Sequence, residues 1–281
     1  MHIDSFYAGN LQLGEGIYYE ELRGLVWWVD ILSRQVYRST TDGTDLQCWS
    51  TPELVGFVLP CSNEDQYWLG LQSGPHLATL QAGHVPDFSR LGTVNTTSPR
   101  VRVNDGSLAA DGGLYVATMD MDARQPLGKL LHYDPAGYVT ELATNFVIAN
   151  GPASPPGQPV VYVVESEGHS GRQKGIYTVD LQNRIPTELL LVAWVYAGSP
   201  DSVSMDATGT LWVGTYGDNC IRQFATTGRL LRTIALPALN LTKVARAGNR
   251  LFVTSAATGV SDQQRQQYPL TGHVLVLDDI D

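Results

Sequence analysis

Six stretches of the chain share one pattern, in which a turn residue leads into a short apolar strand with an aromatic side chain near its centre. These aromatic residues lie 40 to 50 residues apart: Trp28, Trp68, Tyr115, Tyr162, Trp212 and Phe252. A period of this length is the signature of a fold made of repeated supersecondary units. The chain is therefore expected to place six equivalent units side by side.

Each repeat holds about four short strands, because a strand of small residues precedes the aromatic strand and further strands follow it. Four-stranded units repeated around an axis are the blades of a β-propeller. Charged residues make up only 16% of the chain, and its 28 glycines and 15 prolines favour short strands and tight turns. We predict an all-β, six-bladed β-propeller that forms one domain over residues 1–281, with an irregular β-sandwich as the alternative.

The last repeat ends with "HVLVLDDID", before its outermost strand. A bare strand edge invites association with other chains, and closing the ring removes it. We predict that the N-terminal segment "IDSFYA", residues 3–8, supplies the missing strand of the last blade.

One position of the repeat, 11 to 13 residues before each aromatic residue, is mostly polar: Glu15, Gly56, Asn104, Asn150, Asp201 and Asn240. The first strand of each propeller blade lines the central channel, so residues at one phase converge on the axis. Two carboxylates and several amide oxygens brought together away from water need a positive charge among them. A divalent cation meets this need, and the all-oxygen set favours a hard ion such as calcium, magnesium or manganese.

Each of these residues also has a simpler interpretation. The "NG" at 150–151 and the "NDG" at 104–106 are common turn signals, and Asp201 follows a proline that favours turns. Glu15 alone is most simply a solvated acid, although the glycines on both sides of it would let the backbone approach the axis closely. The shared phase of the set, rather than any single motif, supports a cation site.

The charge balance and the lengths of the apolar runs argue against two classes of partner. The formal net charge is −10 and the isoelectric point is near 5.0, whereas nucleic-acid binding requires a basic surface. No apolar run approaches the roughly 18 to 20 residues that span a bilayer, and the N-terminus lacks the basic and apolar regions of a signal peptide. We predict a cytoplasmic protein that binds neither nucleic acid nor membrane.

Seven short stretches carry a resemblance that runs in order along nearly the whole chain: "LGEG" (13–16), "VWWVDI" (26–31), "RVNDGSL" (102–108), "ATMDMD" (117–122), "ANG" (149–151), "PDSVSMDATGTLWV" (200–213) and "RLFVTSA" (250–256). Together they resemble the regucalcin/gluconolactonase family of sugar lactonases, which are also known as senescence-marker-protein-like lactonases. The resemblance implies a six-bladed propeller that hydrolyses an aldonolactone to the aldonic acid. It also implies one divalent cation, with calcium favoured and zinc, manganese, magnesium or iron as alternatives. The expected partner is a small sugar lactone, and no obligate protein partner is expected.

By this resemblance, Glu15, Asn150 and Asp201 correspond to the three metal ligands of the family. Arg102 and Asn104 correspond to the residues that hold the sugar hydroxyls. An arginine offers a rigid fork of donors, and an asparagine offers both a donor and an acceptor.

The chain departs from the family pattern at three places. Ser202 replaces the glycine of "PDG", and the segment "GPASPPG" (151–157) has an extra proline. Asp122 stands where some members have a substrate-contacting acid, which is more often a glutamate. These departures bear on the choice of substrate and leave the predicted metal ligands in place.

Lactone hydrolysis requires a water molecule to attack the ring carbonyl and a proton to reach the leaving ring oxygen. A cation in the predicted site would polarise the carbonyl and stabilise the oxyanion. We expect Asp201 to shuttle the proton as well. A carboxylate bound to a cation is a weak base, so a free water or Asp122 is the alternative.

Two other functions fit the same fold. One is a calcium-dependent esterase or phosphotriesterase, and the other is a non-catalytic propeller that binds a protein. Protein-binding propellers usually carry a blade signature such as the Trp-Asp dipeptide, which the repeats here lack. A binding propeller would also leave the acids of the channel unexplained.

Overall fold

The computed structural model describes residues 1–280, except for residues 62, 64, 93–98 and 184. The described chain forms six antiparallel sheets of four strands each. The first three sheets contain β2 (Gly14–Glu20), β3 (Leu25–Asp30), β4 (Gln35–Thr40) and β5 (Gln47–Ser50); β6 (Val55–Pro60), β7 (Gln66–Leu71), β8 (Gly74–Thr79) and β9 (Phe88–Arg90); and β10 (Val101–Leu108), β11 (Leu114–Asp120), β12 (Gly128–Tyr133) and β13 (Val139–Phe146).

The other three sheets follow the same order, except that the last one takes a strand from the N-terminus. They contain β14 (Ala149–Ala153), β15 (Val160–Glu165), β16 (Gly175–Asp180) and β17 (Thr187–Ala193); β18 (Ser199–Met205), β19 (Leu211–Tyr216), β20 (Cys220–Phe224) and β21 (Leu230–Ala235); and β22 (Leu241–Ala247), β23 (Arg250–Ser255), β24 (Val274–Asp278) and β1 (His2–Tyr7). A 3-10 turn, η1 (Glu21–Arg23), joins β2 to β3, and α1 (Asp262–Gln267) lies between β23 and β24.

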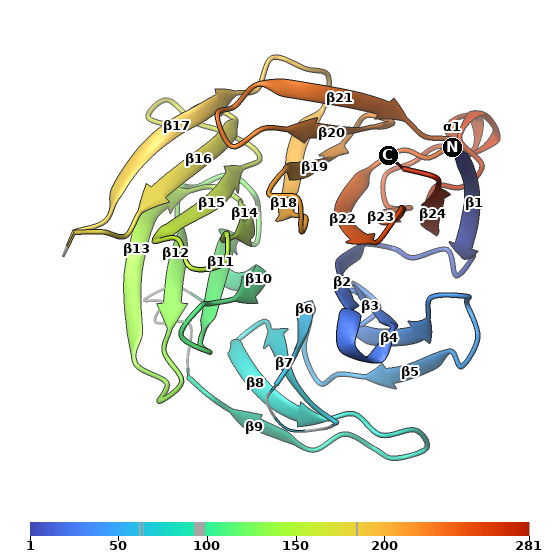
Figure 1. Ribbon diagram of the computed structural model, residues 1–281, viewed down its shortest axis with the longest axis horizontal. Coiled ribbons are helices and arrows are strands. Elements are labelled where there is room, and N and C mark those ends of the chain that lie inside the picture. Colours follow the sequence, from blue (N-terminus) through green and yellow to red (C-terminus); the bar gives the residue numbers. More distant parts are fainter. Residues whose placement is uncertain (62, 64, 93–98, 184, 281) are drawn as a thin grey trace.

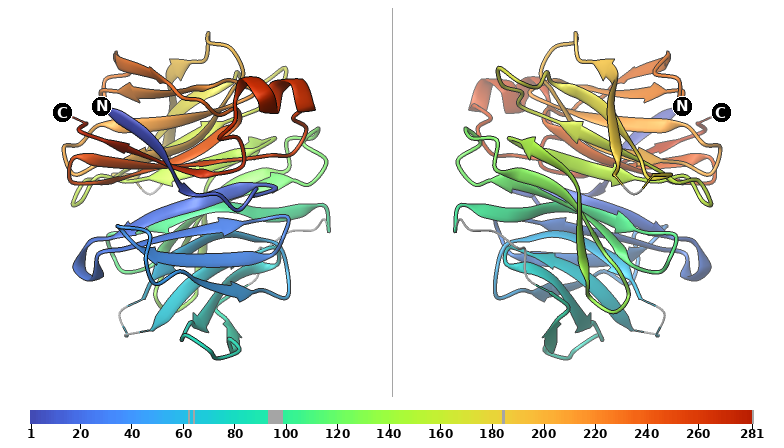
Figure 2. Two further views of the ribbon diagram at one scale, coloured as in Figure 1. Left: turned by 90° about the vertical axis from the view of Figure 1, so that its right-hand side faces the viewer. Right: turned by 90° about the vertical axis from the view of Figure 1, so that its left-hand side faces the viewer.

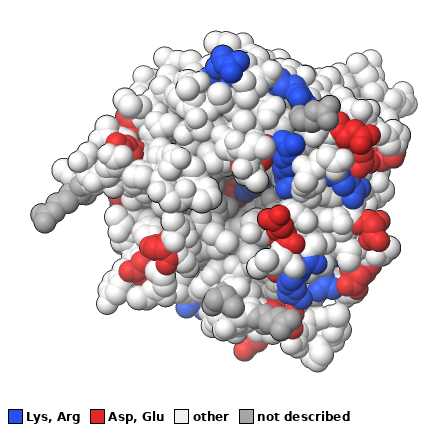
Figure 3. All heavy atoms as spheres, in the orientation of Figure 1, with Lys and Arg blue, Asp and Glu red and all other residues white. Residues whose placement is uncertain are grey.

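The six sheets surround a central axis as the blades of a propeller (Figure 1). The first strands of the blades, β2, β6, β10, β14, β18 and β22, are innermost, and each contacts the first strand of both neighbouring blades. The face shown in Figure 3 is hollowed at its centre, where these inner strands meet. The predicted six-bladed propeller is therefore confirmed, and the alternative of a β-sandwich is wrong.

The N-terminal strand closes the last blade, as predicted. β1 pairs with β24 from His2↔Asp278 to Tyr7↔Val274, so the sheet has the order β1-β24-β23-β22. Both side views place the two chain ends beside each other at this blade (Figure 2). Phe6 lies edge-on to Phe252, with ring centroids 4.8 Å apart, and to Trp28 of the first blade. The strand thus covers the outer edge of β24 and packs between the last blade and the first.

The hydrophobic core lies between neighbouring blades. Successive residues of a strand point to opposite faces of its sheet. Trp27 accordingly packs against Tyr67 of the second blade, at a ring-centroid distance of 4.2 Å, while Trp28 packs into the cluster that contains Phe252 of the last blade. Both indole rings are fully buried, and burial of a side chain this large contributes about 3 kcal/mol to stability. The central aromatic residues of the repeat thus hold the blades to one another.

In the part of the chain that the structure describes, no helix has the length and apolar character needed to cross a membrane. The described helices are the single turn η1 and the six-residue α1.

Candidate active site

A hollow of about 250 Å³ lies at the axis, between the N-terminal halves of the inner strands. Its polar lining comes from four blades: Glu15 on β2, Arg102 and Asn104 on β10, Asn150 on β14 and Asp201 on β18. Five of the six residues predicted to form the site therefore lie together. The carboxylates and the amides are separated by up to 186 residues along the chain, and the propeller brings them to one place.

A bulge in each inner strand turns these side chains toward the axis. The pairing of β2 with β3 shifts after Glu15, and that of β14 with β15 shifts after Asn150. Both residues are followed by a glycine with positive φ, 59° at Gly16 and 47° at Gly151. A Cβ atom at Gly151 would lie 2.0 Å from the backbone nitrogen of Val203, so a side chain there would push the neighbouring blade away. The glycines after Glu15 and Asn150 therefore permit the turn and the close approach of blades, whereas Asp201 is followed by Ser202.

The three predicted metal ligands are buried, and each forms a hydrogen bond with another ligand or with the backbone of the next residue. Glu15, Asn150 and Asp201 are between 4% and 6% exposed. The side-chain nitrogen of Asn150 donates to Asp201 Oδ1, and Asn150 Oδ1 accepts from the backbone N–H of Gly151 at 3.1 Å. Glu15 Oε2 accepts from the backbone N–H of Gly16 at 2.9 Å. The group is thus a compact and dry set of oxygen and amide groups.

The pKa values of the two carboxyl groups reflect this crowding. Burial, followed by the negative charges of Asp201 and Asp105, raises the pKa of Glu15 well above its ordinary value of 4.5. Burial and the charge of Asp105 also raise the pKa of Asp201 above 3.8. Burial lowers the pKa of Arg102 to about 10, while Glu15 and Asp201 act in the opposite direction. The protein alone therefore compensates the charge of these acids incompletely.

This environment fits a hard divalent cation. Two carboxylates and an amide oxygen are ligands that calcium and magnesium prefer. Among the described residues, no three His, Cys, Asp or Glu side chains gather into a metal site by themselves, so a site here needs the amide of Asn150.

The remaining predicted residues fall into two groups. Arg102 Nη1 donates to the carbonyl of Val103 at 2.8 Å, and Asn104 Nδ2 donates to the carbonyl of Ala149 at 3.1 Å, so both side chains are fixed in the wall of the hollow. Asp122 lies outside it: its side chain is 62% exposed and forms an ion pair with Arg100 at 2.9 Å. The role of Asp122 in substrate contact stays a prediction.

Asn240 does not join the ring of polar residues, contrary to its phase in the repeat. It precedes β22 by one residue, and its amide bonds the backbone of Gly217, Ala256 and Thr258. Asn240 therefore fixes loops between blades, and it is absent from the lining of the hollow.

A sequence profile described as the SMP-30/gluconolactonase/LRE-like region matches residues 13–257. The chain belongs to this family. The matched range includes every residue that lines the hollow. The family resemblance expected from seven short motifs is thereby confirmed.

Relatives of this chain include named lactonases. L-arabinolactonase of Azospirillum brasilense is 27% identical over 274 residues, which cover 94% of this chain and 87% of that protein. The 6-deoxy-6-sulfogluconolactonase of Pseudomonas putida is 25% identical over 267 residues, which cover 93% of this chain and 89% of that protein. Among solved structures, the calcium-binding protein regucalcin of Agrobacterium tumefaciens matches with a TM-score of 0.86 at 22% identity, covering 97% of this chain and 92% of that one. The last comparison confirms the fold.

The site of this family member also contains two buried charged residues that the sequence patterns did not single out. Asp105 on β10 is 1% exposed, and Lys243 on β22 is 7% exposed. Lys243 Nζ donates to Asp105 Oδ1 at 2.6 Å. Within the "NDG" motif the phase of the repeat selects Asn104 rather than Asp105, and Lys243 has no motif around it, so no local signal joins these residues 138 positions apart.

Two further acids hold the inner strands in place. Asp30, the last residue of β3, accepts the backbone N–H groups of Gln12 and Leu13, just before β2. Glu165, the last residue of β15, accepts the backbone N–H groups of Val147 and Ile148, just before β14. Both acids therefore fix the chain two or three residues ahead of a predicted metal ligand. Asp30 and Glu165 each stand at the last position of the second strand of a blade, and this shared position is the sequence signal from which they could have been predicted.

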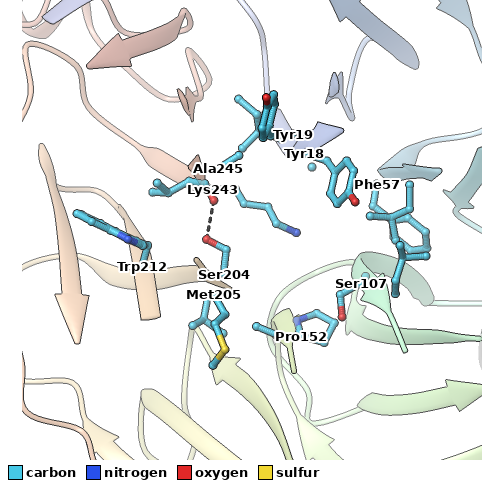
Figure 4. A pocket seen from close by; sticks show the side chains of 18 of the residues that line it. Tyr18, Tyr19, Phe57, Ser107, Pro152, Ser204, Met205, Trp212, Lys243 and Ala245 are labelled. Carbon is cyan, nitrogen blue, oxygen red and sulfur yellow. Dashed lines mark hydrogen bonds between the residues drawn. The ribbon is translucent and has the colours of Figure 1, made fainter. Parts of the chain in front are cut away.

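A second hollow, of about 270 Å³, lies at the C-terminal halves of the inner strands. Its lining includes Tyr18 on β2, Phe57 on β6, Ser107 on β10 and Ser204 on β18. Figure 4 shows the side chain of Lys243 extending from β22 into this hollow. Lys243 thus lies between the hollow and the acids of the candidate site.

Proposed function

We propose that this chain hydrolyses a sugar lactone to the corresponding aldonic acid, with a divalent cation held by Glu15, Asn150 and Asp201. The observation that carries the proposal is the convergence of two buried carboxylates and an amide from three blades at one hollow. Family membership and the named lactonases among the relatives support the reaction class.

Calcium is the proposed native ion. The donor set is entirely oxygen, which suits a hard cation, and the structural neighbour regucalcin is described as calcium-binding. When bound, such an ion supplies Lewis acidity, which polarises the lactone carbonyl and stabilises negative charge on its oxygen. Zinc, manganese, magnesium and iron are the alternatives to be tested.

The chain's own residues have separate tasks in the proposed reaction. Asp201, whose pKa is raised by burial and by Asp105, accepts a proton from the attacking water and delivers it to the ring oxygen that leaves. Arg102 and Asn104 orient the substrate through its hydroxyl groups. The hollow that they line suits a single sugar ring and is closed to a macromolecule, so we propose a small lactone as the substrate.

We also propose that the protein is located in the cytoplasm. Fractionation of the native cells, followed by detection of the chain in the soluble or the membrane fraction, tests this part separately.

The reaction is tested with protein stripped of metal by a chelator. A panel of aldonolactones is assayed by acid release, and calcium, magnesium, manganese, zinc and iron are restored one at a time. We expect activity to vanish on chelation and to return with a divalent ion. Aryl esters and phosphotriesters are assayed in parallel.

The exposed Asp262 of α1 provides a matched control, since Asp262→Asn removes one carboxylate far from the hollow. Its activity should equal that of the unmodified protein. Turnover of aryl esters above that of every aldonolactone would replace the proposed reaction by an esterase reaction. Full activity of the chelated protein would contradict the role of the cation.

A further inference from the structure

Lys243 and Asp105 form an ion pair across the channel. Lys243 belongs to the sixth blade and Asp105 to the third, and their strands β22 and β10 lie on opposite sides of the axis (Figure 1). The two side chains are 9% and 1% exposed, and the distance from Lys243 Nζ to Asp105 Oδ1 is 2.6 Å. The pair therefore bridges two blades that share no sheet and no loop.

Ser202 connects this ion pair to the candidate cation site. Its hydroxyl lies 2.8 Å from Asp105 Oδ2, 3.1 Å from Asn150 Oδ1 and 3.5 Å from Glu15 Oε2. A serine hydroxyl has one proton to donate, and the charged Asp105 is both the nearest acceptor and the strongest. Ser202 stands where the family pattern has a glycine, so the connection depends on a side chain that is a departure of this sequence.

The buried charges show what Lys243 contributes. Glu15, Asp105 and Asp201 are three carboxylates within the channel, and the positive charges beside them are those of Arg102 and Lys243. The ammonium group of Lys243 lowers the pKa of Glu15, against the larger effects of burial and of the neighbouring acids. An unpaired charge buried away from water is strongly destabilising. Removal of the lysine would leave one positive charge among three acids.

We propose that Lys243 is a resident counter-cation of the channel, which stabilises the cation-free protein and weakens the affinity of the neighbouring site for a divalent ion. It acts on the site through Asp105 and Ser202 as well as through space. The effect on affinity depends on the proposed cation site, whereas the effect on the cation-free protein does not. Lys243 is thus a positioning and charge-balancing residue, distinct from the three proposed ligands.

The test compares Lys243→Met with the double variant Lys243→Met/Asp105→Asn, which restores the balance of charge. Calcium affinity is measured by titration calorimetry, and thermal unfolding is measured in the presence of a chelator. We expect Lys243→Met to bind calcium about 10-fold more tightly and to unfold at a lower temperature without calcium. The double variant should bind calcium within about 3-fold of the unmodified protein. Lys243→Arg, which keeps the charge, serves as the matched control.

Unchanged or weaker calcium binding by Lys243→Met would overturn the effect on affinity, and an unchanged unfolding temperature would overturn the effect on stability. If Lys243→Met does not fold, Lys243→Gln makes the same change of charge while keeping a donor for Asp105. If the unmodified protein binds no divalent ion, the proposed function fails. The unfolding comparison then still decides whether Lys243 stabilises the channel.

Discussion

Glu15 and Asp201 are deeply buried at the propeller axis and lie beside other acids, and both conditions disfavour their charged forms. Each group keeps hydrogen bonds to its charged form, from Gly16 to Glu15 and from Asn150 to Asp201, while burial and Asp105 favour the protonated form. Perturbed carboxyl groups of this kind are typical of functional sites. Because the charged forms of these two groups destabilise the fold, the free energy of unfolding of the cation-free protein should depend on pH.

The cation-free protein should lose stability as the pH rises. The folded-state pKa values of Glu15 and Asp201 lie above their ordinary values of 4.5 and 3.8. At pH values between the ordinary pKa and the folded-state pKa of each group, the folded state therefore holds a proton that the unfolded state releases. The contribution of the two groups to the free energy of unfolding is therefore full below about pH 4 and is lost as the pH rises through the folded-state pKa values. Urea unfolding in a chelator at several pH values measures it.

The matched variant for this measurement is Glu15→Gln/Asp201→Asn, which removes both titrating groups. We expect the variant to gain stability relative to the unmodified protein as the pH rises from 5 to 8. A difference that stays constant with pH, or that shrinks, would contradict the assigned environment of the two acids.

The proton shuttle can be assigned by two single substitutions. Asp201→Asn should leave the protein folded and lower lactone turnover at least about 100-fold, since both the proposed ligand and the proposed base are lost. Asp122→Asn should lower turnover less than about 10-fold, because Asp122 is exposed and paired with Arg100 outside the hollow. Steady-state kinetics with saturating calcium measures both. The opposite ranking of the two variants would assign the base to Asp122.

Sequence patterns found the acids and amides of the site but not the ion pair beside them. Glu15, Asn104, Asn150 and Asp201 share a phase of the repeat, and that phase predicted their approach to the axis, although it failed for Asn240. The pairing of Lys243 with Asp105 depends on which side chains span the channel to the opposite blade. That property depends on side-chain length and on the bulges, which leave no periodic trace in the sequence.

At the scale of single elements, the inner strands owe their position to acids at the ends of the second strands. Glu165 accepts four backbone N–H groups, from Val147, Ile148, Glu167 and Gly168, at 2.8 to 3.2 Å. The side chain is fully buried. It therefore satisfies donors that would otherwise be buried without partners, just ahead of Asn150.

Glu165→Ala should destabilise the protein by about 2–4 kcal/mol, because the loss of the carboxylate leaves several backbone donors unpaired. It should also weaken calcium binding, since the segment before Asn150 is released. Urea unfolding and calorimetry measure the two effects. Glu141→Ala is the control: its half-exposed carboxylate pairs with Lys129 on the surface, and its loss should cost less than about 1 kcal/mol. Equal losses in both variants would contradict the positioning role of Glu165.

The phase of the repeat predicted the position of a side chain correctly where the residue lies inside an inner strand. The prediction was wrong where the strand begins after the residue. Asn240 has the expected spacing from Phe252, but β22 begins one residue after it, and its amide binds backbone groups between the blades. A count of residues cannot show in which direction a side chain points at the end of a strand. The same count succeeded for Asn150 because that residue lies inside β14.

For the whole molecule, ring closure by β1 was predictable from an elementary requirement. The last repeat lacks an outer strand, and an open edge of β24 would be left exposed without β1. The arrangement of blades also follows from the regular spacing of the aromatic residues, whose side chains fill the spaces between sheets. The spacing of the aromatic residues does not predict the depth or the lining of the two hollows at the axis.

Deletion of residues 1–8 should destabilise the protein by about 3 kcal/mol or more and promote self-association. The deletion removes the pairing with β24 and the contacts of Phe6 with Trp28 and Phe252. Thermal unfolding and size-exclusion chromatography measure the result. His2→Ala, which changes an exposed side chain of the same strand, is the control. A shortened chain that stays monomeric with unchanged stability would show that closure by β1 is dispensable.

The most direct measurement is the anomalous scattering of a crystal of this protein grown with manganese, an ion that accepts the same oxygen ligands. We predict one strong peak at the channel axis, within about 2.5 Å of oxygen atoms of Glu15, Asn150 and Asp201. A peak bound by other residues, or its absence at millimolar manganese, would contradict the claim that these three side chains form a cation site.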